Sequence, residues 1–106
     1  MPLDADILSD LGLLLQEVRK DPNAAEAVYL EALTIEPDHV ISLFNLGNLK
    51  QFDLNDPDRA EELYRKVIRL NPRDIGALCN LGLLLLFERN NADEAEQMYT
   101  ATSTSL

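Results

Sequence analysis

Few side chains in this sequence could carry out covalent or metal chemistry. The chain has one histidine, His39, and one cysteine, Cys79, which excludes an intramolecular disulfide and any site that needs two histidines. We expect His39, which begins the second repeat described below, to cap a helix or to lie exposed. Cys79 has no cationic neighbour that would activate its thiol, and is expected to be a small apolar wall residue.

The acidic residues and the glycines also lack the spacing of known sites. The Asp and Glu residues do not follow the calcium-loop pattern. The four glycines form no phosphate-binding loop, because three fall inside expected helices and Gly76 falls near a helix start. The sequence therefore predicts no enzyme, no cofactor and no metal site.

The charge balance restricts the partners. The 106 residues include 19 Asp and Glu against 9 Lys and Arg, a net charge of −10. Nucleic acids and anionic membranes attract clustered cations, so neither is expected as a partner. The start MPLDADILSD lacks a secretory signal, and no apolar run approaches the roughly 18–20 residues that span a bilayer. We expect a single cytoplasmic domain.

A repeat of 35 residues organises the chain. Gly12, Gly47 and Gly82 recur at that spacing. Other residues keep the same register, at Leu8/Leu43/Leu78, Leu11/Leu46/Leu81, Ala25/Ala60/Ala95, Glu26/Glu61/Glu96 and Tyr29/Tyr64/Tyr99. Each copy holds two apolar stripes with helical spacing. The sequence thus predicts three helical hairpins and no strand.

Local signals place the helix ends. Asp21-Pro22 and Asp56-Pro57 each put a capping side chain before a proline at the first helical position, and Pro37 and Pro72 stop the second helices. Six helices are expected, at roughly 4–19, 23–35, 39–54, 57–70, 74–89 and 92–102.

A glycine lies inside the first helix of every copy, where it costs roughly 1 kcal/mol against alanine. We expect Gly12, Gly47 and Gly82 to face the small alanine of the paired helix, which lets the two helices approach closely. Those alanines are Ala25, Ala60 and Ala95.

Leu-Gly in the first helix, Ala-x-x-x-Tyr in the second and a closing proline together resemble the tetratricopeptide repeat. The resemblance covers about residues 5–102, as repeats at 5–39, 40–74 and 75–102 with a frayed tail at 103–106. The period is one residue longer than the usual 34 or so. We expect the extra residue in the turn between the paired helices.

The resemblance implies an all-α, right-handed solenoid whose first helices line a concave groove for peptides or proteins. Helical spacing places a set of polar and apolar residues on that groove: Asp10, Leu13, Phe44, Asn45, Asn48, Phe52, Cys79, Asn80, Leu83, Leu86 and Phe87. The leading hypothesis is a non-catalytic scaffold that binds a protein segment there, with Phe44, Leu83 and Phe87 holding its apolar side chains.

Asn45 and Asn80 each precede Leu-Gly. They resemble the asparagine ladder of long arrays of the family, such as those of O-GlcNAc transferase and kinesin light chain. Their amides either grip the backbone of an extended peptide or bond to the neighbouring helix and maintain curvature. The sequence leaves both roles open.

A chaperone C-terminal tail does not fit the groove. The clamp that holds such tails in related proteins needs cations at the slots held here by Ser9, Gly76 and Asn80, and only its asparagine at Asn45 matches. The acidic residues Asp6, Asp10 and Glu17 would also repel an acidic tail.

The third copy favours an alternative function. Its first helix is apolar almost all round, so it is either a well-buried central helix or, with Leu83, Leu86, Phe87 and Phe52, an exposed patch. Self-association through that uncapped end, or membership of a longer array, is the alternative to groove binding.

Five of the nine basic residues lie on or beside the second helix of the second copy, at Arg59, Arg65, Lys66, Arg69 and Arg73. We expect a solvated face with Glu61–Arg65 and Glu62–Lys66 pairs. The alternative is a docking site for an acidic first repeat.

Overall fold

The computed structural model describes residues 3–103, which form three helical hairpins without a strand. The first hairpin is α1 (Ala5–Glu17) with α2 (Pro22–Ile35). The second is α3 (Val40–Asn48), the π-helical segment η1 (Leu49–Asp53) and α4 (Pro57–Leu70). The third is α5 (Ile75–Phe87) with α6 (Ala92–Ala101). The helices lie where the repeat predicts them, except that the expected helix at 39–54 is π-helical over its last turn.

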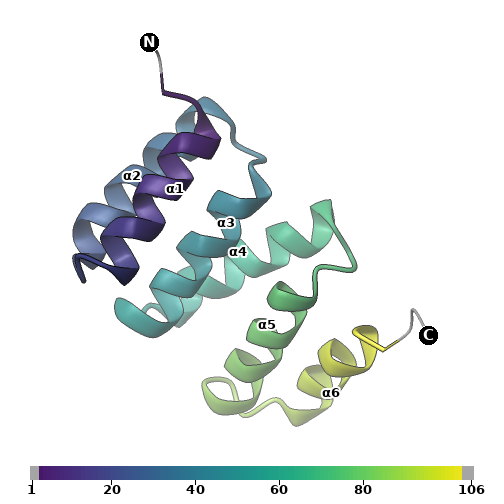
Figure 1. Ribbon diagram of the computed structural model, residues 1–106. Coiled ribbons are helices and arrows are strands. Elements are labelled where there is room, and N and C mark those ends of the chain that lie inside the picture. The colour runs from purple at the N-terminus through teal and green to yellow at the C-terminus, as the bar shows by residue number, and fades with distance from the viewer. Residues whose placement is uncertain (1–2, 104–106) are drawn as a thin grey trace.

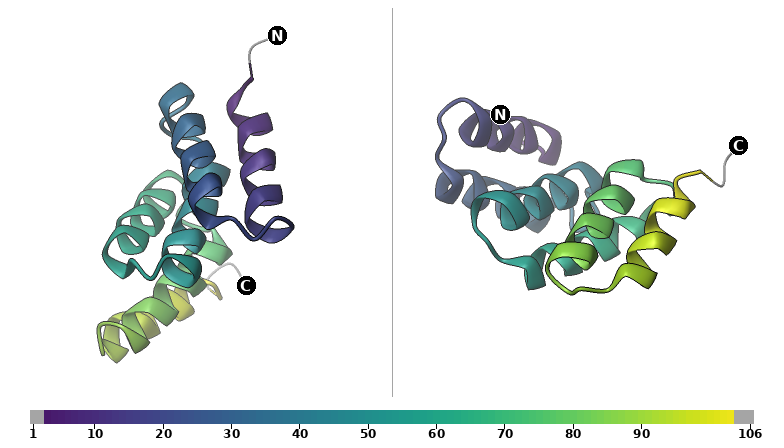
Figure 2. Two further views of the ribbon diagram at one scale, coloured as in Figure 1. Left: turned by 90° about the vertical axis from the view of Figure 1, so that its left-hand side faces the viewer. Right: turned by 90° about the horizontal axis from the view of Figure 1, so that it is seen from below.

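The hairpins stack side by side along an elongated body (Figure 1) of 46 × 27 × 20 Å. Within each hairpin the two helices pack on each other, and α2 then packs on α3 as α4 packs on α5. The further views show the same succession of hairpins (Figure 2). Each internal boundary is therefore formed mainly by a second helix packed on the first helix of the next hairpin, with additional contact between the neighbouring first helices.

The apolar core consists of two clusters. The larger one runs through all three hairpins and includes Tyr29, Tyr64 and the fully buried Leu46 and Leu81. The smaller cluster lies inside the first hairpin and consists of Ala5, Leu8 and Ala32 with Val28 packed against it.

Each α-helix begins with a side-chain cap. The capping atom accepts the backbone N–H three residues later, and the residues that supply it are Asp4, Asp21, His39, Asp56, Asp74 and Asn91. The expected capping role of His39 is thus confirmed. Its ring is buried rather than exposed, because Nε2 lies 2.6 Å from Asp6 Oδ1 and Nδ1 lies 2.6 Å from Ser42 Oγ.

The turn inside each hairpin is wide and repeats its geometry. A residue with positive φ closes the first helix, at Lys20 (55°), Asn55 (51°) and Asn90 (51°). The N–H one residue later (Asp21, Asp56 or Asn91) donates to a carbonyl six residues back, over 2.9, 2.7 and 2.9 Å. Such left-handed closures end many helices, and this one gives the extra residue of the 35-residue period a place in the turn.

The atoms nearest to the mid-helix glycines belong to the tyrosine rings of the paired helices, and the contact expected with the paired alanines stays a prediction. A Cβ added to Gly47 would lie 2.7 Å from Tyr64 Cε1, and one added to Gly82 would lie 2.9 Å from Tyr99 Cζ. The nearest atoms to Gly12 likewise belong to the Tyr29 ring. The glycine therefore provides the space in which the aromatic ring lies.

The tyrosine hydroxyls bond to polar side chains about one turn after the glycine, on the same face of the first helix. Tyr29 Oη donates to Gln16 Oε1 at 2.9 Å, and Tyr64 Oη lies 2.7 Å from Gln51 Oε1 and 2.8 Å from Asn48 Oδ1. Burial, reinforced by the charges of Glu17 and Asp53, raises the pKa of Tyr29 from 10.0 to about 12. Burial raises the pKa of Tyr64 as well.

We predict that Gly47→Ala destabilises the fold. The added methyl group overlaps the Tyr64 ring, and overpacking of about 1–3 kcal/mol exceeds the roughly 1 kcal/mol that alanine gains in helix propensity. Urea unfolding followed by circular dichroism measures the difference. Glu31→Ala, at an exposed position of α2, is the control and should change little. A Gly47→Ala protein more stable than the parent would contradict the packing described.

We also predict a loss of stability above pH 10 to which Tyr29 contributes. Unfolded tyrosine loses its proton near pH 10, whereas the folded chain holds the Tyr29 proton until its pKa of about 12. The folded state therefore binds more protons across that window, and the free energy of unfolding falls as pH rises. In Tyr29→Phe the fall should be shallower than in the parent, measured by thermal melts from pH 8 to 12. Equal slopes would refute the contribution.

Candidate functional site

The first helices and η1 form a surface that carries exposed aromatic residues. Phe52 and Phe87 share one register of the repeat and are 60% and 74% exposed, and Leu83 is 37% exposed. These three residues, with Gln51 and Glu88, line a hollow of about 250 Å³, here named the Leu83 pocket. The expected exposure of the patch is therefore found for these three residues.

A second hollow adjoins the first at Phe52. It has a volume of about 380 Å³ and lies between the wide turn of the first hairpin and η1; its lining residues are Gln16, Glu17, Lys20, Pro22, Phe52 and Asp53. Because Phe52 lines both hollows, the two are neighbours on the surface. We name this second hollow the Glu17 pocket.

Asn45 and Asn80 occupy one register of the repeat, and their amides lie between neighbouring first helices. Asn45 Nδ2 donates to Ser9 Oγ at 3.3 Å, which joins α3 to α1. Asn80 Nδ2 donates to Asn48 Oδ1 at 2.6 Å, which joins α5 to α3. The backbone carbonyl of Asn80 also accepts from Gln51 Nε2 at 3.4 Å. All of these side chains except the buried Ser9 are half-buried.

Other expected groove residues lie apart from the two pockets. Phe44 is half-buried, with its ring 6.2 Å from that of Tyr64 and its edge against Gly76. Asp10 and Leu13 are exposed on α1, and Cys79 is half-buried on α5. None of these four side chains lines either hollow.

Leu86 and Leu11 differ most from expectation. Leu86 lines a separate hollow with Ala95 and Tyr99 of α6, and neither Leu83 nor Phe87 lines that hollow. Leu11 belongs to the apolar stripe of the first helix, which predicts that it packs inside the repeat, but it is 40% exposed on α1. The reason is that its register faces the preceding repeat in the second and third copies, and no such repeat lies against α1.

The charged rim of the two pockets was not predicted from the sequence. Lys20, Asp53 and Glu88 all line them. Asp53 and Glu88 each follow a phenylalanine at the same register of the repeat, and this alignment is the signal that could have identified them.

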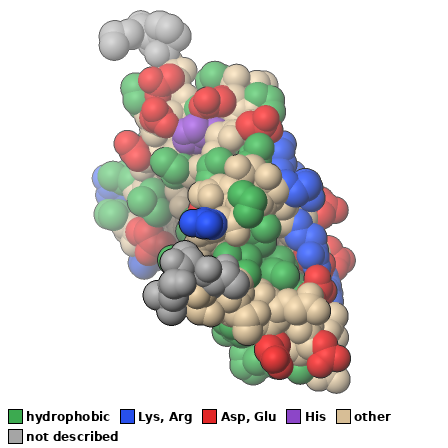
Figure 3. Space-filling model, turned by 90° about the vertical axis from the view of Figure 1, so that its right-hand side faces the viewer, with side chains coloured by type: hydrophobic (Ala, Val, Ile, Leu, Met, Phe, Trp, Pro, Cys, Tyr) green, Lys and Arg blue, Asp and Glu red, His purple; other side chains and the backbone are tan. Residues whose placement is uncertain are grey.

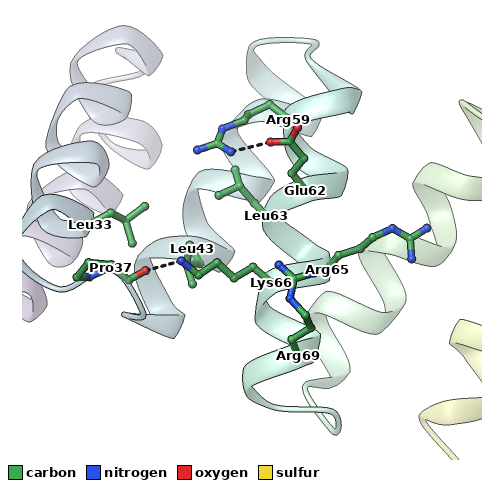
Figure 4. Close-up of a pocket in the computed structure, with 9 residues that line it drawn as sticks. All are labelled: Leu33, Pro37, Leu43, Arg59, Glu62, Leu63, Arg65, Lys66 and Arg69. Carbon is green, nitrogen blue, oxygen red and sulfur yellow. Dashed lines mark hydrogen bonds and ion pairs between the residues drawn. The ribbon is translucent and has the colours of Figure 1, made fainter.

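The basic face of α4 is largely paired within the chain. Glu61 pairs with Arg65 at 2.9 Å as expected, and Arg65 also bonds to Glu94 at 3.0 Å. The expected Glu62–Lys66 pair is wrong, because Glu62 binds Arg59 while Lys66 reaches the Pro37 carbonyl (Figure 4). Lys and Arg gather along one edge of the surface with Asp and Glu beside them (Figure 3). These cations are thus mostly neutralised by neighbours.

Residues 3–103 contain neither a candidate membrane span nor a candidate metal site. No helix there is both long and apolar enough to cross a membrane. In the same residues, no group of three or more His, Cys, Asp or Glu side chains is placed to hold a metal ion.

Comparison with solved structures gives close matches to the fold. A tetratricopeptide repeat protein from Parabacteroides merdae superposes with a TM-score of 0.86 and 26% identity, over 94% of this chain and 38% of that one. The Sgt2 domain from Aspergillus fumigatus gives 0.78 and 25%, over 94% and 67%. YrrB, described as having an unusual peptide-binding site, gives 0.81 and 19%, over 95% and 50%. The chain therefore spans well under two thirds of the first protein and half of YrrB.

Sequence comparison points to the same family. No curated protein matches the sequence significantly. Family models of the tetratricopeptide repeat match residues 40–74 and residues 63–97, which together span the second hairpin and most of the third. With the three-fold repeat and the fold described above, these matches show that the chain belongs to the tetratricopeptide repeat family.

Proposed function

We propose that the chain is a non-catalytic scaffold that binds an apolar segment of a protein or peptide along the Leu83 and Glu17 pockets. The observation that carries the proposal is the exposure of Phe52 and Phe87 around one hollow, at 60% and 74%. Large aromatic side chains at the centre of a depression are the residues that usually dominate binding energy.

The rim charges suggest what flanks the apolar segment. Glu17, Asp53 and Glu88 line the two pockets, and Lys20 is the one cation among their lining residues. An acidic rim favours encounter with a basic segment and disfavours an acidic one. The proposed ligand is therefore an apolar stretch flanked by lysine or arginine.

The asparagines can serve this binding while they join the helices. An amide offers two donors and one acceptor, and the bond from Asn45 to Ser9 uses one donor. The remaining groups are available to the backbone of an extended segment beside the pockets. Asn80 bonds to Asn48 in the same manner, so both amides are proposed to hold the ligand as well as the curvature.

We predict that Phe87→Ala and Phe52→Ala each weaken binding of a fluorescent peptide with leucine and phenylalanine flanked by lysines. The loss should be about fivefold or more, since removal of a central aromatic residue costs over 1 kcal/mol. Fluorescence anisotropy measures the affinity. Ile35→Ala, at a 53% exposed site on α2, is the control variant, and the same peptide flanked by glutamates is the control ligand. Equal affinity for the parent and both phenylalanine variants would refute the site.

For the amides, we predict that Asn45→Ala lowers the affinity for the same peptide several-fold and also costs roughly 1 kcal/mol of stability, because Ser9 loses a hydrogen-bond donor. Anisotropy and urea unfolding separate the two effects. Asn23→Ala, exposed on α2, is the matched control. A loss of stability with unchanged affinity would leave Asn45 with the curvature role alone.

A further inference from the structure

One face of α1 is apolar and uncovered. Ile7, Leu11 and Leu14 are 46%, 40% and 46% exposed. Their leucine counterparts one and two repeats later are fully buried, at Leu46, Leu49, Leu81 and Leu84. In the second and third copies, therefore, the same face lies against the preceding hairpin.

The opposite end of the stack carries the complementary face. Tyr99 is 37% exposed, whereas its counterparts Tyr29 and Tyr64 are completely buried. Together with Leu86 and Ala95, Tyr99 lines a hollow of about 340 Å³ on α5 and α6. In the first and second copies the equivalent face is covered by the next hairpin, as α2 packs on α3 and α4 on α5. The α2–α3 and α4–α5 boundaries are thus two examples, within the chain, of how faces of these two kinds pack together.

The charges at the two ends also match the internal boundary. Arg89 Nε donates to Glu61 Oε1 at 3.1 Å, and the same guanidinium pairs with Asp58, which joins the third hairpin to the second. Arg19 lies at the register of Arg89, two repeats earlier. Asp93 and Glu96 lie at the registers of Asp58 and Glu61, one repeat later. The same three charges are therefore present on the uncovered ends.

The backbone at Arg19 is already in the required conformation. Lys20 and Asn90, which follow Arg19 and Arg89, have φ of 55° and 51°. Within residues 3–103, Arg19, Asp93 and Glu96 take part in none of the ion pairs found. Each end therefore presents an uncompensated charge that the other end would neutralise.

Compared with the internal boundaries, the α1 end carries a larger side chain and the α6 end carries a smaller one. Ile7 replaces the smaller Ser42 and Ala77, whereas Ser103 replaces the larger Leu33 and Ile68. Volume gained on the α1 face is thus offset by volume lost from the α6 face. The hydroxyl residues at the end of α6 also make that face more polar, so the contact should be weaker than the internal ones.

We propose that the protein self-associates head to tail, with α1 of one copy packed on α6 of the next and Arg19 paired with Asp93 and Glu96 of its neighbour. The interface is heterologous, because it joins two different surfaces. Each added copy leaves one face of each kind uncovered, so assembly continues as an open chain of hairpins. This association is independent of peptide binding in the Leu83 pocket, which lies on a different surface.

The test begins with the molar mass of the full chain by light scattering after size exclusion, over about a hundred-fold range of concentration, as an associating system requires. The mass should rise from 11.9 kDa as concentration increases, and the rise should be smaller at high salt. A constant 11.9 kDa at every concentration would overturn the proposal and leave the two faces to a different occupant.

Two variants then distinguish head-to-tail packing from other self-association. Leu11→Glu/Leu14→Glu blocks the head, and Leu86→Glu/Glu96→Arg blocks the tail; all four positions are exposed, so both variants should fold, as circular dichroism verifies. Each alone should stay monomeric, and a mixture should form a 1:1 dimer and nothing longer. Association of either variant by itself would overturn the proposal. Leu30→Glu, at a 43% exposed site on α2, is the control and should associate like the parent.

Arg19→Glu tests the ion pairs separately. This change should weaken association at least about tenfold, because repulsion from Asp93 and Glu96 of the neighbour replaces attraction. Addition of Asp93→Arg and Glu96→Arg to the same chain should restore it. Unchanged association of Arg19→Glu would overturn the assigned pairing.

Discussion

The close contact between a glycine and a tyrosine ring sets the geometry of every hairpin. The absence of a side chain at Gly12, Gly47 and Gly82 allows the ring of the second helix to lie directly on the first. In the first two hairpins the tyrosine hydroxyl also bonds to a glutamine one turn after the glycine, which joins the two helices at a second point. The next hairpin then packs against this buried ring. A substitution at one glycine would therefore disturb a boundary as well as a hairpin.

The periodicity of the sequence predicted the helices because burial and capping both depend on neighbours along the chain. Asp21 and Asp56 cap as expected, and the prolines after the second helices follow their ends. Contacts between helices were harder to predict from the sequence. Helical spacing states on which side of its own helix a residue lies, but does not state which atoms oppose it. It therefore did not identify the tyrosine rings as the nearest neighbours of the glycines, and it assigned Glu62 to Lys66 although Glu62 binds Arg59. Leu11 was placed inside for the same reason, since the burial of its counterparts depends on a preceding hairpin.

The candidate site was only partly visible in the sequence. Phe52, Leu83 and Phe87 were found because helical spacing places all three on the side of the first helices that faces the groove. Leu86 was grouped with them although it lines a separate hollow with residues of α6, because α5 is apolar on nearly every side and its pattern has no preferred direction. The acidic rim depends on the wide turns and on η1, whose π-helical winding no pattern of apolar residues predicted. The bonds from Asn45 and Asn80 to neighbouring helices were foreseen as one of two roles, and the distances now give that role a geometric basis.

The small separate cluster inside the first hairpin has a consequence for how the protein opens. Ala5, Leu8 and Ala32 form a cluster that is separate from the larger one running through all three hairpins. In an array whose units contact only their neighbours, the stability of a terminal unit is the sum of its own packing and one boundary. Helix α1 therefore belongs to the part of the fold with the lowest free energy of local opening. Its amides should exchange with solvent hydrogen through partial unfolding, while those of α3 and α4 exchange only when the whole array unfolds.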